Sequence, residues 1–175
     1  MQKDERYPIG KYEPKPFSEA QKIEWLRDIQ LLPEELERAV QTFDAVQLNT
    51  AYRDGGWTVK QLIHHVADSH MNAYIRFKLG LTELKPVIKP YEEKAWALLA
   101  DNETVPVNVS LTLLHVLHRR WYAAIKDLSQ QDFERTVIHP EQGREMSLWL
   151  LLGLYAWHGK HHTAHIISLK ERMNW

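Results

Sequence analysis

Apolar residues recur at helical spacing along three long stretches of this chain, and this periodicity limits the fold more than any other feature. Residues 58–81, 110–128 and 147–171 each place apolar side chains three and four positions apart, which puts them on one face of an α-helix. Patterns typical of β-strands are nearly missing, and only residues 136–138 resemble a short extended segment. The sequence therefore predicts an all-α protein.

Capping residues and prolines indicate where helices begin and end in the first third of the chain. Residues 18–21 and 58–61 have the spacing of capping boxes, in which a Ser or Thr side chain and a Gln three positions later cap a helix. Pro33 fits the first position of a helix and is disfavoured inside one. We therefore expect a short helix ending at Gln30 and a second helix from Pro33 to Phe43.

A long connection separates the helix at 58–81 from the helix at 110–128. Residues 85–109 contain three prolines around one short helical piece at 91–100. Such a segment is long enough to cross over the end of a bundle, so a tight hairpin is not required. The sequence predicts a four-helix bundle with a long crossover connection between the second and third core helices. No repeat or Gly/Ser linker divides it, which indicates a single domain over residues 1–175.

Charge and composition exclude several classes of function. The chain has 22 Lys and Arg against 23 Asp and Glu, with no basic run, which argues against binding to nucleic acid. The longest apolar stretch, residues 148–157, is too short to span a membrane, and the charged amino end lacks the apolar region of a signal peptide. Cysteine is absent, as is common in a reducing compartment. We expect a cytoplasmic protein that binds neither nucleic acid nor membranes.

The segment HGKHHTAH gives the strongest sign of chemistry. His158 and His162 lie four positions apart, as do His161 and His165, so each pair shares a helix face and can bind one divalent ion. No Glu occupies the general-base position of the HExxH motif, which removes the main support for a peptidase. Rotation along the helix places His162 near the middle of the apolar stripe and His158 at its edge, and so favours this pair as the one facing the core.

A metal site needs a third ligand, and periodicity leaves several candidates. His64 points away from the apolar stripe of its helix and is rejected. His65 lies at the border of the stripe and His70 lies within it, so both stay open. His115 and His118, on the helix at 110–128, are further competitors.

Two separated motifs resemble the DinB/YfiT-like family. GWTVKQLIHHVADSHMNAYIRFK has Trp-Thr followed by His65, eight residues after Trp57, and YAWHGKHHTAHI has the later His158-x-x-x-His162. The resemblance extends from about Pro33 to Leu169. It selects His65 from the two open residues and implies a metal held by His65, His158 and His162. The family usually has Gln at the position of His165.

The resemblance further implies a four-helix bundle, a homodimer and a metal-dependent hydrolase that acts on a small molecule. Three imidazoles leave a position for water or substrate, whereas structural zinc sites are closed by four protein ligands. We expect one divalent ion per subunit, with zinc favoured and nickel also suited to imidazole. Water at such an ion has its pKa lowered to about 7 and becomes a nucleophile.

Three functions are kept as hypotheses. The first is hydrolysis, and the second is thiol S-transfer, since some relatives use bacillithiol, mycothiol or glutathione. The third is a non-catalytic metal-binding stress protein, which predicts no pocket beside the metal. Asp68 is a candidate acceptor for the free ring nitrogen of His65. Arg76 is a candidate partner for the carboxylate of a thiol.

Overall fold

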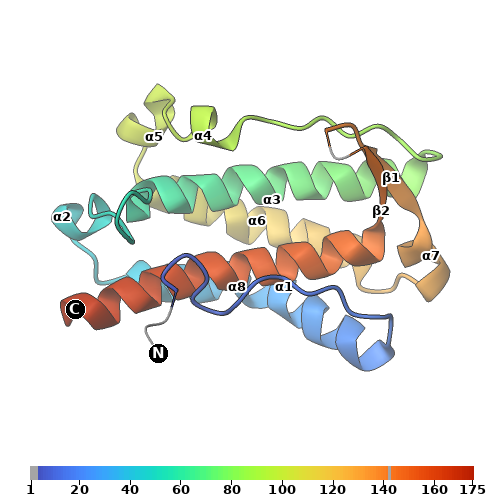
Figure 1. The fold of residues 1–175 in the computed structure, drawn as a ribbon, viewed down its shortest axis with the longest axis horizontal. Helices are drawn as coiled ribbons and strands as arrows, with labels where there is room; N and C mark the ends of the chain where they lie inside the picture. The colour runs from blue at the N-terminus through green and yellow to red at the C-terminus, as the bar shows by residue number, and fades with distance from the viewer. Residues whose placement is uncertain (1–3, 142) are drawn as a thin grey trace.

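Four long helices form the bundle in the computed structural model, which describes residues 4–141 and 143–175. They are α1 (Glu19–Val40), α3 (Val59–Thr82), α6 (Val107–Ile125) and α8 (Leu148–Met173). α1 packs on α6 and α8, and α3 packs on the same two helices. α1 and α8 run in one direction and α3 and α6 in the other (Figure 1). The predicted four-helix bundle is confirmed.

The crossover connection is also confirmed. Residues 83–106 run back along the length of α3 and carry α4 (Glu93–Trp96) and α5 (Ala100–Thr104), so that α6 starts at the same end as α3 (Figure 1). Two hydrogen bonds from α3 hold this connection: the Gln61 amide donates to the Ala97 carbonyl at 3.1 Å, and the Lys60 ammonium donates to the Glu103 carbonyl at 2.6 Å. The connection therefore lies against α3.

The remaining elements are short and lie at the bundle ends. The segment predicted to be extended forms β1 (Thr136–His139), which pairs antiparallel with β2 (Arg144–Ser147). α2 (Ala45–Leu48) precedes α3, and α7 (Gln130–Glu134) precedes the hairpin. The predicted single domain over residues 1–175 includes residues 1–3 and 142, which lie outside the described residues. None of the described helices has both the length and the apolar character needed to cross a membrane.

The predicted helix break at Pro33 is wrong, because α1 continues through this proline. Proline lacks an N–H, so the Ile29 carbonyl, four residues earlier, loses its usual partner within the helix. The His118 ring supplies the missing donor, with Nδ1 2.5 Å from the Ile29 oxygen. Leu32 and Leu36 are buried on either side. A contact from a distant helix thus offsets the local cost of the proline.

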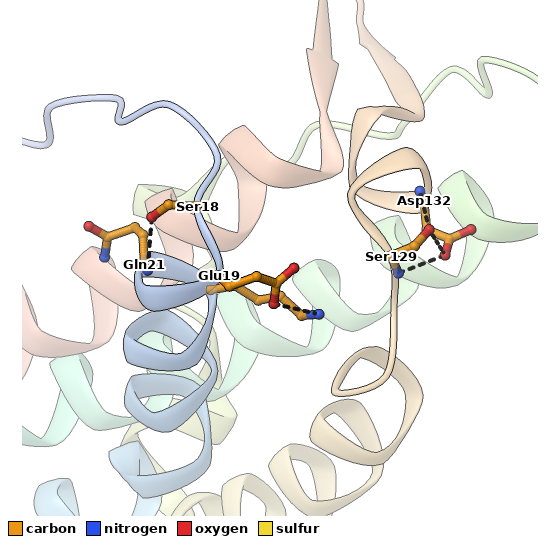
Figure 2. A network of polar contacts seen from close by, with 6 residues as sticks. Ser18, Glu19, Gln21, Ser129 and Asp132 are labelled. Carbon is orange, nitrogen blue, oxygen red and sulfur yellow. Dashed lines mark hydrogen bonds and ion pairs between the residues drawn. The ribbon is translucent and has the colours of Figure 1, made fainter.

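Side-chain caps fix the helix starts largely as predicted. The Ser18 hydroxyl accepts from the Gln21 N–H at 3.1 Å, but the Gln21 amide donates to Glu24, so α1 has the predicted cap without the reciprocal half of the box. Figure 2 shows this cap and the complete box that Ser129 and Asp132 form at the start of α7. Thr58 and Gln61 form the predicted capping box of α3. α6 begins earlier than predicted, at Val107 rather than Ser110, because Pro106 with its fixed φ provides the N-terminal boundary.

The apolar core is divided into two clusters along the bundle. One contains residues 73–77 of α3 and 148–156 of α8, and the other contains residues 59–67 of α3 together with Ile166 and Leu169 of α8. Between the clusters lies a layer of histidines, of which His158 is half-buried and five are buried: His70, His118, His161, His162 and His165. Buried polar groups are costly unless they have partners, so this layer is where a ligand site is expected.

Candidate metal centre

Three imidazoles from two neighbouring helices meet in the histidine layer. His65 comes from α3, and His158 and His162 come from successive turns of α8. The Nε2 atom of His158 lies 3.2 Å from Nε2 of His65 and 3.1 Å from Nε2 of His162. One ring nitrogen from each residue lies within 4.8 Å of the others. The three residues that the sequence singled out therefore lie together.

These separations fit a single metal ion. Nitrogen ligands at 2.0–2.1 Å in a tetrahedral zinc site are about 3.3 Å apart, which is close to the two short distances observed here. A donor set of three imidazole nitrogens suits zinc and nickel, whereas magnesium and calcium prefer oxygen. The three side chains could hold one divalent ion.

Burial keeps the three rings neutral, as metal ligation requires. Desolvation lowers the pKa of His65 to about 4. It also lowers the pKa of His158 and of His162 well below the usual value, and the neighbouring imidazoles lower both further. At neutral pH each ring therefore has one nitrogen lone pair available.

A cavity of about 590 Å³ opens beside the three histidines, and all three line it. Its other walls combine aromatic and charged side chains: Tyr52, Arg53, Trp57, Glu93, Lys94 and Trp157. Glu93 and Lys94 belong to the crossover connection, and Trp57 packs on the His65 ring with centroids 4.6 Å apart. A small molecule in this cavity would contact the histidine nitrogens directly.

The other candidate ligands lie outside the three-histidine group. His70 contacts the other nitrogen of His158, with its Nε2 3.2 Å from His158 Nδ1, and His118 in turn contacts His70. His64 is buried against α6 and pairs with Ser110, and His115 is a half-exposed partner of Glu37.

The second pair on α8 is a separate contact. The Nε2 atoms of His161 and His165 lie 3.1 Å apart, and the His161 ring stacks on Trp157. Burial, followed by the charges of His161, Arg53 and Arg172, lowers the pKa of His165 to about 3. The nearby arginine charges disfavour a cation at this pair.

Asp68 and Arg76 do not have the contacts predicted for them. Among the residues that the structure describes, no hydrogen bond joins the Asp68 carboxylate to His65. Instead, desolvation and the neighbouring Asp101 charge raise the pKa of Asp68 to about 6. The Arg76 guanidinium donates to the Tyr155 hydroxyl at 2.6 Å and does not line the cavity. The cavity cations are Arg53 and Lys94, which sequence reasoning missed.

The place of Arg53 in the sequence could have identified it as a residue of the site. It directly precedes the Asp-Gly-Gly turn that leads into Trp57 and Thr58, the motif shared with the DinB/YfiT-like family. A turn that places Trp57 at a site also places the residues next to the turn near that site. Lys94 had no such signal, because its place depends on the path of the crossover connection.

Comparison with known proteins places the chain in a family. A family model described as the DinB superfamily matches residues 29–166, a range that includes His65, His158 and His162. The chain belongs to the DinB superfamily. This DinB protein is 54% identical over 173 residues to a Bacillus cereus protein described as "Putative metal-dependent hydrolase", covering 98% of this chain and 99% of that relative. A Bacillus anthracis protein with the same description is 53% identical with the same coverage.

A solved structure shares the fold of this DinB protein. YfiT from Bacillus subtilis is 49% identical, with a TM-score of 0.95 over 98% of this chain and 99% of YfiT. Its description is "a probable metal-dependent hydrolase with an unusual four-helix bundle topology". In this DinB protein α1 runs parallel to α8, and α3 runs parallel to α6, to which the crossover connection joins it (Figure 1). The TM-score shows that YfiT shares this overall arrangement.

Proposed function

We propose that this DinB protein is a metal-dependent hydrolase that holds one divalent ion per subunit through His65, His158 and His162. The observation that carries this proposal is the group of three ring nitrogens within 4.8 Å of one another on the wall of a 590 Å³ cavity. The descriptions of the Bacillus relatives and of YfiT support it. Zinc is the proposed ion, and nickel suits the same nitrogens.

The chemistry follows from three ligands beside a cavity. His65, His158 and His162 would hold a divalent ion with a position left for water or substrate, and such an ion would supply Lewis-acid activation of water and of the bond attacked. Tyr52, Trp57 and Trp157 give the cavity aromatic walls against which the apolar part of a small substrate could pack. Arg53 and Lys94 provide positive charge for an anionic group on that substrate.

The test measures hydrolysis of a panel of reporter esters and amides before and after metal removal. We expect activity to disappear on treatment with a chelator and to return when zinc or nickel is added to the dialysed protein. Activity that survives complete metal removal would contradict the proposal. Activity restored equally in His158→Ala would contradict the assignment of the ligands.

Thiol S-transfer is the second candidate, and the cavity cations favour it. Arg53 and Lys94 suit the carboxylates of a low-molecular-weight thiol such as bacillithiol, and a thiol is deprotonated where it coordinates a metal. Incubation of a reporter electrophile with and without a panel of thiols separates the two functions. Consumption that depends on the thiol indicates transfer, and consumption in water alone indicates hydrolysis.

The cavity argues against the third hypothesis, a non-catalytic metal-binding protein, because that hypothesis predicts no pocket beside the ion. The homodimer and the cytoplasmic location stay predictions.

A further inference from the structure

A continuous chain of contacts runs from α1 to the metal centre through one group of each core helix. The Ile29 carbonyl of α1 contacts His118 Nδ1 of α6 at 2.5 Å. His118 Nε2 contacts His70 Nδ1 of α3 at 3.0 Å, and His70 Nε2 contacts His158 Nδ1 of α8 at 3.2 Å. The remaining nitrogen of His158, Nε2, faces His65 and His162. No step of the chain passes through solvent, since His70 and His118 are 0% and 1% exposed.

The carbonyl at the start gives this chain a direction. A carbonyl oxygen only accepts, so His118 Nδ1 must carry the proton, and the Nε2 of the neutral ring must then accept. The donor to His118 Nε2 is therefore His70 Nδ1–H, which leaves His70 Nε2 as an acceptor. His158 Nδ1–H donates to it, and His158 Nε2 is left with its lone pair.

The rings of the chain are held neutral by their surroundings. No carboxylate is a hydrogen-bond partner of His70 or His118 among residues 4–141 and 143–175, and the Trp121 ring packs edge-on against both. An additional proton would place an uncompensated charge in the core. With one proton per ring, the carbonyl leaves only one arrangement in which every contact is a hydrogen bond.

Pro33 makes this carbonyl available. In an ordinary helix the N–H of residue 33 would occupy the Ile29 oxygen, but proline has no N–H to donate. The proline that interrupts the hydrogen bonding of α1 thus gives His118 a fixed acceptor in the core.

We propose that His118 and His70 are positioning residues that fix His158 in the tautomer with its proton on Nδ1, and so present the Nε2 lone pair to the metal. This proposal rests on the metal site of the proposed function. Metal-ligating histidines commonly donate their second ring N–H to a carbonyl or carboxylate, which fixes ring orientation and tautomer. Here two further imidazoles carry that role from a backbone carbonyl to the ligand.

The experiment compares three variants with wild type. His70→Leu removes both nitrogens, whereas His70→Gln retains an acceptor oxygen near the position of Nε2. His64→Leu is the matched control. It also removes a buried histidine of α3, but His64 pairs with Ser110 and takes no part in the contacts between His118, His70 and His158. The readouts are the zinc Kd, from competition with a chromogenic chelator, and the ¹⁵N chemical shifts of the His158 ring in metal-free protein.

We expect the zinc Kd to rise about 10–100-fold in His70→Leu and to stay within about threefold of wild type in His70→Gln and His64→Leu. In metal-free wild type the ¹⁵N shifts should show the His158 proton on Nδ1. The proposal is overturned if His70→Leu folds and binds zinc as wild type does, if His70→Gln binds as weakly as His70→Leu, or if the wild-type proton lies on Nε2.

The tautomer measurement separates this proposal from the metal site itself. Absence of zinc binding in wild type would contradict the metal site, whereas a His158 proton on Nδ1 in that same sample would still support the chain. If His70→Leu does not fold, the zinc Kd of His70→Gln and the wild-type tautomer decide the proposal.

Discussion

At the scale of single residues, two of the three proposed ligands follow from local patterns within one helix. His158 and His162 are four positions apart on one helix, and the apolar stripe of α8 indicates which face they share. His65 could not be derived in this way, because the choice between His65 and His70 depends on how α3 is rotated against α8. Only the resemblance to the DinB/YfiT-like family selected it. The sequence offered His70 and His118 only as candidate ligands, since the contacts that define their role are made with other helices.

The buried neutral histidines predict a dependence of stability on pH. The folded-state pKa of His65 and of His118 is lowered to about 4, so the unfolded chain binds more protons between pH 6.5 and 4. The free energy of unfolding of the metal-free protein should therefore fall as the pH falls through this range, by about 1.4 kcal/mol per pH unit for each such histidine. Urea unfolding at pH 7, 6 and 5 measures it.

Asp68 provides the control for this prediction. Its pKa is raised to about 6, so its protonation on acidification stabilises the folded state and opposes the histidines. In Asp68→Asn the loss of stability between pH 7 and pH 5 should be steeper than in wild type. A free energy of unfolding that does not change over this range in either protein would show that the histidines are not buried as described.

At the scale of helices, contacts between elements decided what the sequence could not. The capping residues Ser18 and Thr58 predicted the starts of α1 and α3 because a cap is local, but the continuation of α1 through Pro33 depends on His118 of α6. The close packing of α8 on α1 likewise depends on a glycine. A Cβ at Gly159 would lie 2.6 Å from Leu32, so this glycine allows the turn that carries His158 to pack closely on α1.

Gly159→Ala should destabilise the protein through this contact. The added methyl overpacks the α1–α8 interface, which costs about 1–3 kcal/mol and exceeds the gain of about 1 kcal/mol in helix propensity. We expect a lower free energy of unfolding in urea. Leu32→Ala removes the opposing side chain, so in the Leu32→Ala background the added alanine should be tolerated. Equal costs in both backgrounds would contradict the close packing.

At the scale of the whole molecule, the crossover connection does more than join α3 to α6. The prolines and length of residues 85–109 predicted a long crossover connection, but not that it runs along α3 and forms part of the cavity wall. That outcome depends on its hydrogen bonds to Lys60 and Gln61 of α3. These bonds place Glu93, Lys94 and Leu98 beside the histidines, although the connection is separated from α8 in the sequence.

Lys94→Gln tests whether the connection takes part in substrate binding. Loss of one charge-assisted contact should raise KM about 10-fold for a substrate with an anionic group and leave KM for a neutral analogue unchanged. Steady-state kinetics with a matched pair of anionic and neutral reporter esters measures the difference. A KM that changes equally for both esters would indicate a general distortion of the cavity.

The central claim is that His65, His158 and His162 together hold one ion, and metal content tests it most directly. Untagged wild type and the three single alanine variants are loaded with zinc, dialysed and analysed for metal. His161→Ala serves as the control, because His161 also lies on the cavity wall but outside the three-histidine group. We predict one ion per chain in wild type and in His161→Ala, and loss of the ion in the other three variants. Retention of a full ion in any of those three, or its loss in His161→Ala, would contradict the site.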